Sequence, residues 1–111
     1  MTSLQSKVGK IAAALTGISG LRVYHYWRTG EPAPYCVYYE QDADMRQMDN
    51  HVGEYSVTVY VDYFTKAEYD PMVDAIMEAL DAVDGCAFSY EGALYEEDTN
   101  MIHSSWSCEV I

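Results

Sequence analysis

The segment 54–64 constrains the fold of this chain more than any other, because it alternates strictly along its length. Every second position is apolar or aromatic and the positions between are mostly polar: Tyr55, Val57, Val59, Val61 and Tyr63 alternate with Ser56, Thr58, Tyr60 and Asp62. Successive side chains of a strand point to opposite faces, so this period predicts a long antiparallel strand with one buried face. The second face keeps Tyr60 and Phe64 and is only partly polar.

Two segments repeat apolar residues with the period of a helix. The first spans 1–16, where Ser3 is a candidate N-cap. The second follows the long strand: residues 65–68 have the T-x-x-E form of a capping box, Asp70-Pro71 offers another helix start, and Gly85 marks the end. The apolar stripes are Leu4, Val8, Ile11 and Leu15 in the first segment and Val73, Ile76, Met77, Leu80 and Val83 in the second.

Four further segments favour strands: 21–27, 35–40, 86–95 and 101–111. The polar stretch 41–53 is predicted to be a long loop or a bulged extension of the strands beside it. The resulting order, α-β-β-β-α-β-β, lacks both a glycine-rich phosphate loop and the regular β-α alternation of a parallel sheet. We therefore expect one α+β domain over 1–111, with a single mostly antiparallel sheet of about five strands and both helices on one face.

Charge is divided unevenly along the 111 residues, whose net charge is −12. Up to Tyr39 the chain carries four Lys or Arg and one Glu, a net +3, whereas the rest carries two against seventeen acids, a net −15. So few cations argue against specific nucleic-acid binding, whose affinity comes from neutralised phosphates. No apolar run approaches the ~20 residues of a membrane span, and a signal-like N-terminus is missing. We expect no membrane association and a cytoplasmic protein.

Motifs for chemistry are missing from the sequence. The three histidines, His25, His51 and His103, have no partner at metal-ligand spacing. His103 and Cys108 lie five apart in a predicted strand and so face opposite sides, which argues against a catalytic dyad. Cys36, Cys86 and Cys108 are predicted to be free, buried or half-buried thiols. We therefore predict no enzyme, no catalytic or metal residues, and no cofactor.

Tyrosine is unusually frequent, with eleven in the chain. Tyr24, Tyr26, Tyr35 and Tyr38 cluster in the first two predicted strands, and neighbours in a strand cannot all face one helix layer. Amphipathic aromatics are enriched in protein–protein interfaces, so these tyrosines are candidate interface residues. The alternative is that they cover a sheet face in a monomer. Met45 and Met48 are either gap fillers over the core or part of a docking arm.

The order and texture of these segments resemble small tail-completion proteins of long-tailed bacteriophages and prophages, the tail-terminator or head–tail joining proteins. The resemblance rests on the N-terminal amphipathic helix, a strand at 21–26, the Pro-containing run 31–39, a polar loop carrying Asp49-Asn50, the long alternating strand leading into Phe64-Thr65 and a helix, and the acidic Glu96-Glu97-Asp98 before an aromatic-containing strand. It adds Asp49 and Asn50 to the candidate interface. The insert 45–48 and the additional tyrosines depart from the pattern.

The resemblance implies a structural virion-assembly protein. Such proteins form rings, usually hexameric, at the head-proximal end of the tail tube, where they stop polymerisation and contact the head-side connector. The resemblance therefore implies a homo-oligomer, with tail-tube and head-connector partners, that is in the host cytoplasm during assembly and then in the virion. A ring needs a heterologous interface, which the uneven charge could supply, and an acidic channel would let DNA pass without binding it.

Two other classes fit the composition. An acidic inhibitor or DNA-mimic protein would present carboxylates spaced like phosphates to a DNA-binding partner, but the Tyr-rich strands weigh against it. A small enzyme or ligand-binding domain would need a pocket with convergent polar groups, and no motif nominates one.

Overall fold

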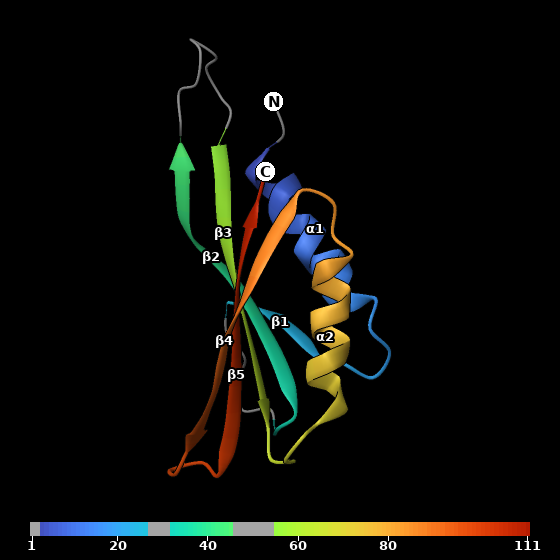
Figure 1. The fold of residues 1–111 in the computed structure, drawn as a ribbon, viewed down its shortest axis with the longest axis vertical. Helices are drawn as coiled ribbons and strands as arrows, with labels where there is room; N and C mark the ends of the chain where they lie inside the picture. The colour runs from blue at the N-terminus through green and yellow to red at the C-terminus, as the bar shows by residue number, and fades with distance from the viewer. Residues whose placement is uncertain (1–2, 27–31, 46–54) are drawn as a thin grey trace.

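A computed structural model describes residues 3–26, 32–45 and 55–111 of the chain (Figure 1). The elements, in order, are α1 (Leu4–Thr16), β1 (Val23–His25), β2 (Tyr35–Met45), β3 (Tyr55–Thr65), α2 (Pro71–Asp81), β4 (Cys86–Glu96) and β5 (Met101–Val110). This order and the α+β class are the ones that the sequence predicts. No described helix has the length and apolar character that crossing a membrane requires.

The five strands form one twisted sheet in the order β1-β2-β3-β5-β4. Only the short pairing of β1 with β2 is parallel, and the other three pairings are antiparallel. Both helices lie on the same side of the sheet, as Figure 1 shows, and among the described residues the opposite face has no helix layer. We call that opposite face the helix-free face. The prediction of a mostly antiparallel sheet with two helices on one face is confirmed.

The main core lies between the helices and the centre of the sheet. Alternate residues of β3 are almost fully buried there: Val57 and Tyr63 are 1% exposed, and Val59 and Val61 are 0% exposed. Ile11, Ile76 and Trp106 pack into the same cluster from α1, α2 and β5. The period of two in the sequence of β3 is therefore the exposure pattern of the strand, and it fixes which face the helices cover.

Two strands differ from the sequence-based expectation by more than one residue, each for a local reason. The predicted strand 21–27 is reduced to Val23–His25, because Tyr26 adopts a left-handed backbone with φ +73° that ends the extended run. The strand predicted at 35–40 continues to Met45 through a bulge between Glu40 and Asp42, so the bulged extension is the better interpretation as far as Met45. Residues 46–53 lie outside the described part of the chain.

The T-x-x-E sequence at 65–68 does not begin a helix. Thr65 is the last residue of β3, and its hydroxyl accepts from the Ala67 N–H two residues on, which forms a local turn. The helix begins instead at Pro71, with Asp70 as its N-cap, as the Asp70-Pro71 step predicts. Gly85 lies beyond the helix end, with φ +74°, in the turn that leads into β4.

The Asp70 carboxylate joins the end of β3 to the start of α2. Its Oδ2 accepts from the hydroxyls of Tyr63 and Thr65, both at 2.7 Å, and its Oδ1 accepts from the Met72 N–H at 2.9 Å. Partial burial works against the charged carboxylate, but the hydrogen bonds outweigh it and lower the pKa of Asp70. The ionised carboxylate therefore stabilises the fold.

We predict that Asp70→Asn lowers the free energy of unfolding by about 1 kcal/mol at neutral pH, because the charge-assisted hydrogen bonds weaken. The folded-state pKa lies below the unfolded value, so the contribution is present above the unfolded pKa and is lost as the pH falls through the folded pKa. Urea unfolding at pH 7 and near pH 3 measures the difference. Asp81→Asn, an exposed change at the other end of α2, is the control. A deficit for Asp70→Asn that is the same at both pH values would contradict this role.

Candidate functional site

The structure distributes the predicted interface tyrosines over both faces of the sheet. Tyr24 and Tyr35 lie in a second, smaller cluster with Val37 and Phe64 on the helix-free face. Tyr35 is only 4% exposed, so it supports this cluster more than it offers contact area. The helix-free face therefore carries a packed cluster of aromatic side chains and is not uniformly polar.

Tyr38 and Tyr26 belong to the helix side, near the edge formed by β1. Tyr38 packs against the main core, whereas Tyr26 is 47% exposed. Met45 is the last residue of β2, but its side chain lies outside the described part of the chain. The remaining predicted interface residues, Met48, Asp49 and Asn50, also lie outside it.

A row of rings crosses the helix-free face from β1 to β5. Tyr24 meets Tyr35 edge-on at 6.4 Å between ring centroids, Tyr35 stacks on Phe64 at 4.9 Å, and Phe64 stacks on His103 at 4.2 Å. The strand register sets this order, because Tyr35, Phe64 and His103 are direct cross-strand partners. Leu94, the partner of His103 on β4, extends the row and is 66% exposed. We call Tyr24, Tyr35, Phe64, His103 and Leu94 the aromatic row.

His103 connects the aromatic row to acidic groups on the same face. Its Nε2 lies 3.0 Å from Asp62 Oδ1 and 3.3 Å from Ser105 Oγ, and its Nδ1 lies 3.8 Å from Glu96 Oε2. The hydrogen bond to Asp62 is the largest influence on the ring, and it raises the pKa of His103 despite partial burial. One ring nitrogen faces both the carboxylate and the hydroxyl, so the arrangement is not that of a Ser-His-Asp triad, which uses the two nitrogens separately.

A second aromatic group lies where β1 meets β2. The His25 ring lies between Tyr26 at 4.3 Å and Tyr38 at 4.5 Å, and its Nε2 is 2.7 Å from Glu40 Oε1. Partial burial opposes ionisation of Glu40, but hydrogen bonds from Tyr26 and His25 outweigh it and lower the pKa of Glu40. His25 therefore has a structural role, since it holds Tyr26, Tyr38 and Glu40 together at this edge of the sheet.

Two of the three thiols, Cys36 and Cys108, do not have the character of nucleophiles. In contrast, the hydrogen bond with Cys108 and the charge of Lys10 lower the pKa of Cys86 despite partial burial. Cys36 and Cys108 are buried and Cys86 is half-buried, as the sequence predicts. Burial raises the pKa of Cys36 to about 12, and the hydrogen bond with Cys86 together with burial raises the pKa of Cys108. Across the described residues, no three His, Cys, Asp or Glu side chains are grouped so that they could hold a metal ion.

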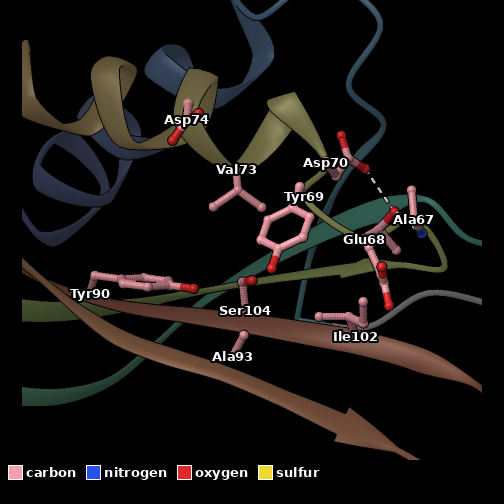
Figure 2. Close-up of a pocket in the computed structure, with 11 residues that line it drawn as sticks. Ala67, Glu68, Tyr69, Asp70, Val73, Asp74, Tyr90, Ala93, Ile102 and Ser104 are labelled. Atoms are coloured by element: carbon pink, nitrogen blue, oxygen red, sulfur yellow. Dashed lines mark hydrogen bonds between the residues drawn. The ribbon is translucent and has the colours of Figure 1, made fainter.

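A groove on the helix side was not anticipated from the sequence. It has a volume of about 460 Å³. It lies between the first turn of α2, the loop before that helix, and the parts of β4 and β5 near the turn that joins these two strands (Figure 2). Tyr69 and Tyr90 line it and are 98% and 41% exposed. The sequence places Tyr90 in a strand and Tyr69 just before a helix, but it does not show that the two are neighbours. They meet because α2 packs beside the β4–β5 hairpin.

The fold uses its N-terminal cations internally. Lys7 Nζ donates to the Tyr55 carbonyl at 3.0 Å, Lys10 Nζ to the Asp84 carbonyl at 3.2 Å, and Arg22 to the Pro34 carbonyl at 2.8 Å. Exposed carboxylates meanwhile lie on α2 and on the β4–β5 hairpin: Asp74, Glu78, Asp81, Glu91, Glu97 and Asp98. These carboxylates lie on both sides of the sheet, because α2 covers one face whereas Glu91 accepts from the Ser107 hydroxyl on the helix-free face. The three described N-terminal cations contribute less to a basic patch than their number suggests.

Comparison with known proteins gives one family. The family model described as tail completion protein gp17 matches residues 6–111, nearly the whole chain. No curated protein matches the chain. The match includes every strand and all but the first two residues of α1, so it covers both the helix-covered and the helix-free faces.

We predict that the stability gained from His103 depends on pH. The folded-state pKa is raised, so the contribution is fully present below the unfolded pKa and is lost as the pH rises through the folded pKa. His103→Gln should therefore destabilise the protein by up to about 1 kcal/mol more at pH 5.5 than at pH 9. Urea unfolding of both proteins measures this, with Asp62→Asn as a partner variant expected to show the same trend. An equal deficit at both pH values would contradict the ion pair.

Proposed function

Since this chain belongs to the tail completion protein family and is a phage tail and virion assembly protein, we propose that it forms a ring at the head-proximal end of the tail tube. In that position it acts as a tail terminator or head–tail joining protein. It ends tube polymerisation and offers a surface to the head-side connector. The protein is then in the host cytoplasm during assembly and in the virion afterwards.

The observation that carries this proposal is the aromatic row on a face that no helix covers. A cyclic ring joins two different patches of each subunit. The aromatic row is one patch, with Leu94 exposed at its β4 end. The exposed carboxylates of α2, on the other side of the sheet, form a surface of different composition, and the two surfaces together give the unlike patches that a head-to-tail contact needs. The resemblance favours a hexamer.

The acidic residues fit a channel through which DNA passes. Glu91, Glu97 and Asp98 are exposed on the β4–β5 hairpin. Carboxylates offer phosphates no counter-charge, so a ring that directs the hairpin inward would let DNA slide without binding it. In this role the protein needs no catalytic residue, and we propose that it is not an enzyme.

An acidic inhibitor that mimics DNA is the second candidate, and the exposed carboxylates along α2 favour it. It differs from the ring in one measurable respect. A mimic acts as a monomer on a basic partner, whereas a ring subunit associates with itself.

We predict that light scattering finds mass rising from the 12.5 kDa monomer towards a hexamer as protein concentration increases. Leu94→Ser should weaken this association because it removes apolar contact area at the exposed end of the aromatic row. Leu4→Ser, at a 45% exposed position on α1, is the matched control and should associate like the parent protein. A 12.5 kDa mass at every concentration and salt would contradict spontaneous ring formation and favour the inhibitor.

Val59→Ala provides the folding reference for these variants. Val59 is fully buried, so we predict a loss of about 1–3 kcal/mol in the free energy of unfolding. Urea unfolding should show this loss for Val59→Ala and less than about 0.5 kcal/mol for Leu94→Ser. If Leu94→Ser loses as much stability as Val59→Ala, its effect on association cannot be assigned to the interface.

A further inference from the structure

The groove beside α2 combines a largely apolar floor, which also includes Ser104, with an acidic rim. Ala93, Ile102 and Tyr90 come from β4 and β5 and lie below, while Val73 contributes from α2 (Figure 2). Tyr69 stands at the mouth and is 98% exposed, with its hydroxyl directed towards the floor strands. An apolar floor with this opening can take the side chains of a docked chain segment rather than an isolated ion.

Two carboxylates of the rim are available to a partner. Glu68 and Asp74 line the groove and are exposed. Asp70 also lines it, but its oxygens already accept the three hydrogen bonds that cap α2. Lys66 lies in the same loop and is exposed, yet it is not among the lining residues. The rim therefore favours a cationic occupant.

The strand that borders the groove has an open edge. β4 is the last strand in the sheet order, so its outer side has no partner strand among the described residues. Ala93, Leu94 and Tyr95, near the C-terminal end of β4, are exposed. An open strand edge pairs readily with an extended segment, whose alternate side chains then point to the same face of the sheet. The groove lies on one of the two faces that such a segment would reach.

The occupant is better supplied by a different protein than by a second copy of this chain. Lys7 is 5% exposed and donates to the Tyr55 carbonyl, and Lys10 donates to the carbonyls of Asp84 and Ile111. Arg22 donates to the carbonyls of Pro32 and Pro34. Because these three of the four described cations hold the fold together, using them in the groove of a neighbouring copy would remove them from their own backbone contacts. The fourth, Lys66, lies in the loop that forms the groove itself.

We propose that the groove and the outer edge of β4 bind an extended segment of another virion protein, whose side chains on the groove face are alternately apolar and cationic. The apolar side chains enter the groove over Ala93 and Ile102, and the cationic ones meet Glu68 and Asp74 at its rim. This inference rests on the proposed assembly function for the identity of the partner as a virion protein. The binding itself does not depend on ring formation.

The probe is a capped, fluorescently labelled peptide of three Lys-Thr-Val-Thr repeats, which places Lys and Val on one face when extended; it is titrated with the full-length protein and followed by anisotropy at low salt. A peptide of the same composition with all lysines first and all valines last tests the need for alternation. Glu68→Gln/Asp74→Asn removes two rim charges. Glu78→Gln/Asp81→Asn removes two exposed charges of α2 outside the groove and is the matched control. Ala93→Trp fills the floor.

We expect one peptide to bind per monomer and the block peptide to bind more weakly. The rim variant should raise Kd at least about fivefold, and the matched control less than about twofold. Ala93→Trp should weaken binding with an unchanged circular dichroism spectrum. Equal weakening by the two charge variants, equal binding of the two peptides, or no binding would overturn the proposal.

Light scattering of the same variants keeps this result separate from the proposed ring. Self-association that is lost in Glu68→Gln/Asp74→Asn and Ala93→Trp, but kept in the matched control, would assign the groove to a second copy and overturn the proposal. A ring that forms equally in all variants, together with a peptide site that fails in the groove variants, supports it. Failure of the ring alone leaves the peptide result standing.

Discussion

Burial of one face of β3 is the constraint on which the rest of the structure depends. Val59 and Val61 are completely buried at the centre of the sheet, between α1, α2 and the flanking strands. Each buried aliphatic side chain of this size contributes about 1.5–3 kcal/mol. The strand therefore needs helices on one face and a neighbouring strand along each edge. Asp70, bonded to the end of β3, fixes where α2 starts relative to that strand.

Covering only one face has a consequence for what the protein can do. Both helices pack on the face of the sheet that carries the buried side chains of β3. The helix-free face therefore carries the aromatic row, and among the described strands β4 keeps an open edge. The helix-free face and the edge of β4 are therefore surfaces that can make contacts with other chains. That distribution of surface agrees with membership of a virion-assembly family, in which a subunit acts through its contacts.

Features set by neighbouring residues could be predicted from the sequence, whereas features set by strand register could not. The alternation of β3 predicts both ends of that strand within a residue, and the Asp70-Pro71 step predicts the start of α2, because each signal is local. Gly85 misplaces the end of α2, which lies at Asp81. The parallel pairing of β1 with β2 is set by tertiary contacts, and it divides Tyr24 and Tyr38 between two faces. The groove has no sequence signal, since it depends on how α2 lies beside the β4–β5 hairpin.

The central claim is that this protein occupies the junction between head and tail, and localisation on phage particles tests it most directly. Purified particles carrying an epitope-tagged copy of the chain would be labelled with gold-conjugated antibody and viewed by electron microscopy. The account predicts label at the head-proximal end of the tail, and label at the same end of tails that lack heads. Label distributed along the tube, or complete absence of the protein from particles, would contradict it.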